Sequence, residues 1–112
     1  PYVPSPLLYK GTLYYLSHYQ GILSVTHAES GKTKSGPFRI DSLREIYASP
    51  VAASNHIYIT SREGQTIVIR HENEHKHIAF NKLEDSFSAS AAIAGNHLFL
   101  RGEKYLYCIG LK

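Results

Sequence analysis

The 112-residue sequence has no methionine, no tryptophan and a single cysteine. One cysteine excludes a disulfide framework and any cysteine-rich zinc site. Without a methionine the chain cannot begin at its own translation start, so we expect a processed product or a segment cut from something longer. No apolar run approaches the roughly 18 residues of a transmembrane helix. The first residues also lack the charged region and apolar stretch of a secretory signal.

The sequence also has only a small excess of charge of one sign. Twelve Lys and Arg against nine Asp and Glu give a net charge of +3, and the basic residues form no stripe. Nucleic-acid-binding surfaces carry such a stripe, so we expect no nucleic-acid partner. What is abundant is tyrosine, with nine residues. Tyrosine favours strands because its ring packs well on a pleated, half-buried surface.

Three segments of the sequence align without a gap. Each begins at a serine, runs through a small or apolar stretch to a pair of turn-forming residues, and ends on aliphatic, aromatic and apolar residues. The serines are Ser5, Ser49 and Ser90, so the period is 44 residues and then 41. The turn pairs tolerate positive φ, so each segment is predicted to form a strand, a tight turn and a second strand. These pairs are Lys10-Gly11, Ser54-Asn55 and Gly95-Asn96.

Another turn and a third strand follow in every copy. Turns that contain glycine fall at 19–21, 62–64 and 101–103, and third strands are predicted at 22–25, 66–69 and 105–109. A weaker fourth strand is predicted around 38–40 and 77–80, whereas the third copy stops at Lys112 before any fourth strand. No segment has a sustained 3.6-residue period, so little helix is expected.

Four short antiparallel strands in roughly 40–45 residues are typical of a propeller blade. The second and third strands are apolar at consecutive positions, as in sheets that are covered on both faces. We therefore predict an all-β fold of antiparallel four-stranded blades, under three blades of an incomplete β-propeller. The partial propeller spans 1–112, with repeats at about 4–48, 49–89 and 90–112. The alternative is a small independent β-sandwich with weak internal symmetry.

The turn after the first of these third strands resembles the quinoprotein-like β-propeller repeat, also called the pyrroloquinoline-quinone (PQQ)-like repeat. The segment Ala28-Glu29-Ser30-Gly31-Lys32 matches the end of that family's turn, although His27 replaces the family's Asp and a following Trp is absent. The Ser-Pro starts at Ser5 and Ser49 and the apolar ending at 106–109 are also similar to the family. The resemblance is to C-terminal blades of a bacterial PQQ-like repeat protein and spans nearly the whole chain.

This resemblance implies two kinds of function. Quinoprotein dehydrogenases of the family hold PQQ at the centre of the ring with a carboxylate base, a calcium ion and often a vicinal disulfide, and none of these maps onto this sequence. Other members are non-catalytic platforms in bacterial envelopes. We therefore expect a non-catalytic structural or binding scaffold without a cofactor, located in the periplasm or cell envelope. The alternative is part of a PQQ-dependent dehydrogenase whose catalytic residues lie on further blades.

The densest group of possible metal ligands lies between the third and fourth strands of the middle copy. His71, His75 and His77 stand with two glutamates within the segment 71–77, and imidazole ligates Zn²⁺, Ni²⁺ and Cu²⁺. On a strand, His75 and His77 share a face. A metal-binding module through these three histidines is the second alternative function, and a solvated polar loop is the plainer interpretation.

We identify no catalytic group in the sequence. His56 and His97 occupy the same repeat position, just after a turn, where a polar residue suits the rim of a sheet. Cys108 lies in an apolar strand and is predicted to pack in the core as a small hydrophobe. The repeated serines have no nucleophile-elbow glycines around them, so no catalytic serine is expected.

An incomplete ring leaves strand edges exposed, and unpaired edges invite pairing with another chain. We therefore expect the chain to contact the remaining blades of a parent propeller or a protein partner, or to self-associate edge to edge. We expect no membrane insertion, because no apolar segment is long enough.

Overall fold

The computed structural model describes residues 5–17, 22–39, 46, 48–71, 73–87, 89–95 and 97–110, with the backbone alone at 17, 35–39 and 73–80. These residues form strands and turns without any helix. In this part of the chain no helix is therefore long and apolar enough to cross a membrane.

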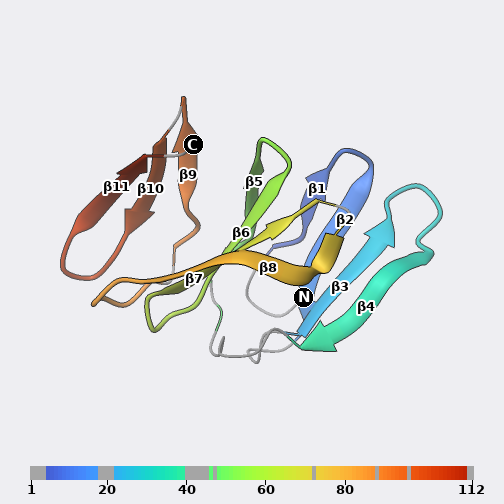
Figure 1. Ribbon diagram of the computed structural model, residues 1–112, viewed down its shortest axis with the longest axis horizontal. Helices are drawn as coiled ribbons and strands as arrows, with labels where there is room; N and C mark the ends of the chain where they lie inside the picture. The colour runs from blue at the N-terminus through green and yellow to red at the C-terminus, as the bar shows by residue number, and fades with distance from the viewer. Residues whose placement is uncertain are drawn as a thin grey trace.

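The strands form three antiparallel sheets that stand side by side (Figure 1). Each sheet orders its strands as the chain does, and the third lacks a fourth strand among the described residues. Separate sheets in sequence order are propeller blades rather than the two layers of a sandwich, so the predicted fold class is confirmed. Sheet 1 contains β1 (Leu7–Tyr9), β2 (Thr12–Ser17), β3 (Ile22–His27) and β4 (Thr33–Arg39). Sheet 2 contains β5 (Val51–Ala53), β6 (His56–Thr60), β7 (Gln65–Arg70) and β8 (Asn73–Lys82), and sheet 3 contains β9 (Ala92–Ala94), β10 (His97–Arg101) and β11 (Leu106–Gly110).

The first turn of each sheet has the backbone that its residue types predict. Successive residues with positive φ are typical of the type I′ turn, whose twist matches that of the flanking strands. Asn96 and the predicted turn at 19–21 lie outside the described residues. The φ angles are 48° at Lys10, 72° at Gly11, 51° at Ser54, 63° at Asn55 and 60° at Gly95.

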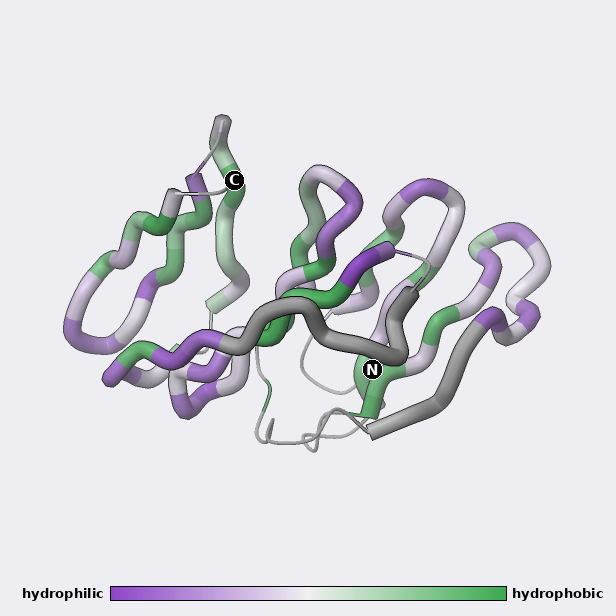
Figure 2. The backbone as a smooth tube through the Cα atoms, viewed as in Figure 1, coloured by the Kyte–Doolittle hydropathy of each residue, from purple (hydrophilic) through white to green (hydrophobic). Residues whose placement is uncertain are grey.

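Two hydrophobic cores hold the sheets together, one on each face of sheet 2. Sheet 2 is therefore covered on both sides, which explains the run of consecutive buried residues at 66–69. Figure 2 shows the hydrophobic residues in the strands and hydrophilic ones at the turns. The first core joins Tyr14, Leu16, Leu23 and Val25 of sheet 1 to Ile57, Ile59, Ile67 and Ile69 of sheet 2. The second joins Val51 and Tyr58 of sheet 2 to Ile93, Leu98, Leu100 and Tyr107 of sheet 3.

The two interfaces between sheets are built in the same way. The aromatic residue of the second strand faces the following sheet, as Tyr14 does in sheet 1 and Tyr58 in sheet 2. Its aliphatic neighbours in β6 and β10 face the preceding sheet, because successive side chains of a strand point to opposite faces. We call the aromatic side of each sheet its forward face and the other its rear face. The sheets thus stack head to tail.

A linker of residues 83–87 joins sheet 2 to sheet 3. The Leu83 N–H donates to the Gly64 carbonyl at 2.9 Å, and the Phe87 N–H donates to the Arg62 carbonyl at 3.0 Å. On the other side, Phe87 forms a bridge with Gly102. The Phe87 side chain is fully buried in the second core. The linker therefore connects the β6–β7 turn to the β10–β11 turn through its own backbone.

Candidate functional site

The repeated serines form a ladder of hydrogen bonds from sheet to sheet. The Ser5 N–H donates to the Ser49 hydroxyl oxygen at 2.8 Å, and the Ser49 N–H donates to the Ser90 hydroxyl oxygen at 3.1 Å. These bonds therefore join the segments that precede the first strand of each sheet, namely β1, β5 and β9. The structure gives the Ser49 and Ser90 hydroxyls a structural role, which explains why serine stands at the start of the second and third copies.

Asp85 connects the linker to the β10–β11 turn through several hydrogen bonds. Its carboxylate accepts hydrogen bonds from the N–H groups of Ser86 at 2.8 Å, Lys104 at 3.1 Å and Tyr105 at 3.2 Å, and from the Tyr107 hydroxyl at 3.1 Å. A side chain at Gly102 would collide with this carboxylate. Asp85 thus fixes the β10–β11 turn to the linker, a role that the sequence around it does not indicate.

The surroundings of Asp85 shift the titration of two groups. Burial alone raises the pKa of Asp85, but hydrogen bonds from Ser86, Lys104, Tyr105 and Tyr107 outweigh it and hold the pKa below its usual value. The pKa of Tyr107 is raised, first by burial and then by its hydrogen bond to the Asp85 carboxylate. The carboxylate is therefore ionised at neutral pH and serves as an acceptor that organises the turn.

Cys108 is exposed, so its predicted core position is wrong. The strand assignment holds, because Cys108 pairs with Phe99 in β10 just as Val25 pairs with Tyr14 and Val68 with Tyr58. Both valines are buried, since another sheet covers the forward face on which they lie. Among the described residues, no strand covers the forward face of sheet 3. Cys108 thus occupies the strand position that is buried in sheets 1 and 2, but it is exposed because no described strand covers it.

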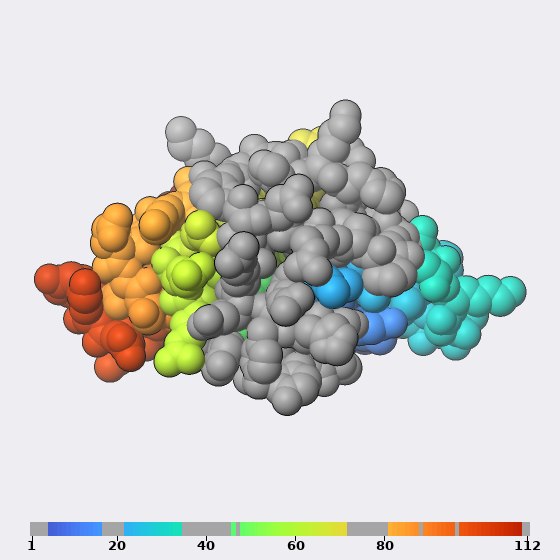
Figure 3. All heavy atoms as spheres, turned by 90° about the horizontal axis from the view of Figure 1, so that it is seen from below, coloured from blue at the N-terminus to red at the C-terminus, as the bar shows by residue number. Residues whose placement is uncertain are grey.

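The two outermost faces of the stack are partly apolar. Leu106 is 65% exposed on the forward face of sheet 3, and Leu8 is 64% exposed on the rear face of sheet 1. Leu13 and Tyr15 lie half-buried on that same rear face. Figure 3 shows sheet 3 and sheet 1 at opposite ends of the molecule. These faces lie where a further sheet of the same kind would stack.

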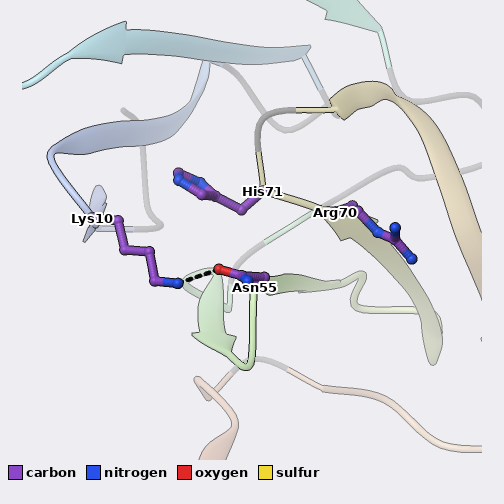
Figure 4. Close-up of a pocket in the computed structure, with 4 residues that line it drawn as sticks. All are labelled: Lys10, Asn55, Arg70 and His71. Carbon is purple, nitrogen blue, oxygen red and sulfur yellow. Dashed lines mark hydrogen bonds between the residues drawn. The ribbon is translucent and has the colours of Figure 1, made fainter.

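A polar pocket opens where the turn ends of sheets 1 and 2 meet. It has a volume of about 350 Å³ and is lined by Lys10, Asn55, Arg70 and His71, which we call the seam pocket (Figure 4). The Lys10 ammonium donates to the Asn55 side-chain oxygen across the two sheets. The Asn55 N–H donates to the Tyr9 hydroxyl at 2.8 Å, so a second contact holds the same turn.

His71 is held in place by tyrosines of sheet 1. Its Nδ1 lies 2.6 Å from the Tyr14 hydroxyl, and its ring meets the Tyr9 ring edge to face with centroids 5.2 Å apart. For His75 and His77 the structure describes the β8 backbone alone. Among the described residues no group of three His, Cys, Asp or Glu could hold a metal ion. The metal site at His71, His75 and His77 therefore stays a prediction, with His71 committed to a contact that a metal at Nδ1 would displace.

The repeated histidines lie beside the repeated aromatic residues. The His56 ring centroid is 6.5 Å from that of Tyr58, and the His97 centroid is 6.2 Å from that of Phe99. His97 is exposed and His56 half-buried. Each ring packs along its own strand near the turn.

Comparison with known proteins identifies the fold. No protein-family model matches the sequence, and no curated protein sequence matches it. A europium-containing methanol dehydrogenase superposes with a TM-score of 0.67 at 13% identity, over 95% of this chain and 22% of that one. BamB from Moraxella catarrhalis superposes with a TM-score of 0.52 at 13% identity, over 94% of this chain and 41% of that one. The chain thus spans less than half the length of either protein.

These similarities bear on the resemblance drawn from the sequence. Both proteins are β-propellers with PQQ-like repeats. Among the described residues no group of three His, Cys, Asp or Glu could hold a metal ion, and the single cysteine cannot form a vicinal disulfide. We therefore derive no reaction step through that cofactor. The three stacked sheets have the fold of blades from a β-propeller with PQQ-like repeats, as the repeats of the sequence predict.

Proposed function

We propose that the chain is a non-catalytic scaffold, a stack of propeller blades whose end faces bind further sheets of the same kind. One observation carries this proposal, namely that both internal interfaces pair a forward face with a rear face. The outer faces present the equivalent positions, with Phe99 at the position of Tyr14 and Tyr58. The forward face of sheet 3 therefore suits the rear face of a further sheet as its partner.

Burial of the exposed leucines would stabilise contacts between the end faces. Fully burying a leucine stabilises by about 1.5–3 kcal/mol, so covering Leu8 or Leu106, each about two-thirds exposed, contributes about 1–2 kcal/mol. For the chain on its own, the partner is a second copy that places its sheet 1 on the sheet 3 of the first. Such head-to-tail contact does not close on itself in a dimer, so it continues into longer assemblies.

Sedimentation velocity over a wide concentration range tests this function. We expect the wild-type mass to rise with concentration and the Leu106→Lys variant to remain monomeric, because the lysine ammonium cannot be buried without a partner charge. Ser30→Lys is the matched control, since Ser30 is exposed in the β3–β4 turn, outside the strands that form the two end faces. A wild-type chain that stays monomeric at every concentration would contradict the proposal. Association that survives Leu106→Lys would point instead to the edge-to-edge pairing expected from the sequence.

A second candidate function is a segment of a PQQ-dependent dehydrogenase. The similarity in fold to the europium-containing methanol dehydrogenase favours it. In this candidate the catalytic residues lie on further blades, so the test adds PQQ and calcium to the full-length protein and follows quinone absorbance and reduction of a dye by an alcohol or sugar. A change in absorbance supports this candidate, and the absence of any binding excludes it.

A protein partner and a periplasmic or cell-envelope location belong to the scaffold proposal. Both are supported by the resemblance to non-catalytic propellers of bacterial envelopes. Fractionation of cells with an antibody against the chain tests the location, and recovery in the cytoplasmic fraction alone would contradict it.

A further inference from the structure

The hydrogen bonds between the repeated serines all run in one direction along the stack. In each case the N–H group of a serine donates to the hydroxyl oxygen of the serine in the following sheet, from Ser5 to Ser49 and from Ser49 to Ser90. The ladder therefore ends on a hydroxyl at Ser5 and on an N–H group at Ser90. Within the part of the chain that the structure describes, no donor reaches the Ser5 hydroxyl and no acceptor reaches the Ser90 N–H.

The two open ends of the ladder lie beside the two end faces of the stack. Ser5 precedes β1 at the rear face of sheet 1, and Ser90 precedes β9 at the forward face of sheet 3. Both serines are exposed, whereas Ser49 between them is half-buried. A second copy that stacks its sheet 1 on sheet 3 of the first therefore brings an acceptor at its Ser5 towards a donor at Ser90.

The apolar part of this contact does not by itself fix how one sheet lies on the next. Leu106 occupies the strand position at which Leu23 is fully buried in sheet 1, so it gains burial when a sheet covers it. Burial of apolar surface has no preferred direction, and sheets displaced along one another still bury it. A hydrogen bond forms only within a narrow range of distance and angle. The serines thus supply the directional contact that the leucines lack.

We propose that Ser5 and Ser90 set the register between two copies of the chain, with the Ser90 N–H of one copy donating to the Ser5 hydroxyl oxygen of the next. This inference rests on the proposed head-to-tail contact and adds the residues that position it. The seam between copies then repeats the bonding of the two seams within a copy. The bond also accounts for serine at the start of the first copy, where the hydroxyl has no partner among the described residues.

Ser5→Ala separates the contact between copies from the fold of one copy. It removes the hydroxyl but keeps the N–H that donates to Ser49, so the urea midpoint should not change. We expect association to weaken about three- to tenfold, the effect of losing one hydrogen bond between neutral groups. Ser5→Thr keeps a hydroxyl and should associate as the wild type does.

Ser49→Ala is the matched control. It removes the hydroxyl that accepts from Ser5 within one copy, and it leaves the Ser5 hydroxyl and the Ser90 N–H in place. We therefore expect a lower urea midpoint and unchanged association in sedimentation velocity.

Hydrogen exchange at the Ser90 amide tests the bond itself. In a mixture of ¹⁵N-labelled Leu8→Lys with unlabelled Leu106→Lys, the labelled copy keeps an unaltered sheet 3 and the unlabelled copy an unaltered sheet 1. The two copies can therefore meet at one contact only. We expect exchange of the Ser90 amide to slow several-fold on mixing. This protection should be lost when the unlabelled copy also carries Ser5→Ala.

The outcomes distinguish this inference from the proposed function. A mixture that stays monomeric would overturn both. A dimer whose Ser90 amide exchanges as fast as in the labelled variant alone would overturn the register inference only, because the faces then meet without the serines. Equal weakening of association by Ser5→Ala and Ser49→Ala would also overturn it, since the loss would not be specific to the open end of the ladder.

Discussion

Replacing Gly64 with alanine tests the close contact between the β6–β7 turn and the linker. Gly64 has a φ of 92°, and a Cβ there would overlap the Leu83 carbonyl oxygen and lie 2.8 Å from the Asp85 carbonyl oxygen. The positive φ alone costs a residue other than glycine about 1–3 kcal/mol. Moving the linker away adds the loss of the hydrogen bonds from Leu83 and Phe87, about 0.5–1.5 kcal/mol each. We expect Gly64→Ala to lower the free energy of unfolding by about 2–6 kcal/mol.

Gly95→Ala is the matched control for this substitution. Gly95 also has a positive φ, of 60°, but a Cβ there meets nothing within 4 Å. We therefore expect a loss of only about 1–2 kcal/mol from the backbone conformation. Urea unfolding followed by circular dichroism gives both values, and hydrogen exchange should show lost protection at Leu83 and Phe87 in Gly64→Ala alone. Equal destabilisation of the two variants would refute the claim that the linker packs against Gly64.

Three further substitutions or additions test other parts of the structure. Because hydrogen bonds lower the pKa of Asp85 in the folded chain, its contribution to stability is complete above about pH 4 and is lost as the pH falls through the lowered value. The gap in urea midpoint between wild type and Asp85→Asn should therefore narrow on acidification, and a gap that widens contradicts this. Phe87→Ala should destabilise by about 3–5 kcal/mol, because Phe87 is fully buried, and a loss below about 1 kcal/mol would show that the linker is not part of the core. If His71, His75 and His77 bind Zn²⁺, replacing all three with alanine should abolish the binding heat, and unchanged affinity would exclude the site.

Much of the fold could be predicted because the repeat encodes it locally. The turn pairs at Lys10-Gly11 and Ser54-Asn55 adopt the positive φ that their residue types favour. Runs of apolar residues in β6 and β7 reflect the two cores around sheet 2. Sheet 3 contains three strands within the part of the chain that the structure describes.

The errors and omissions concern contacts between distant segments. Cys108 was expected in the core because its strand is apolar, but burial depends on a sheet stacked against the strand rather than on the strand itself. Asp85 gave no local signal, since its partners at Lys104, Tyr105 and Tyr107 lie about twenty residues away. The seam pocket combines turns separated by a full repeat. Its one visible signal was that Lys10 differs from Ser54 and Gly95 at the same repeat position.

The central claim is that the end faces bind head to tail, and mixing two blocked variants tests it most directly. Leu8→Lys blocks the rear face of sheet 1, and Leu106→Lys blocks the forward face of sheet 3. Each variant alone should remain monomeric in sedimentation velocity, because every contact needs one face of each kind. Their mixture should form a one-to-one dimer and nothing larger, since one intact pair of faces remains. A mixture that stays monomeric, or either variant associating alone, would contradict the account.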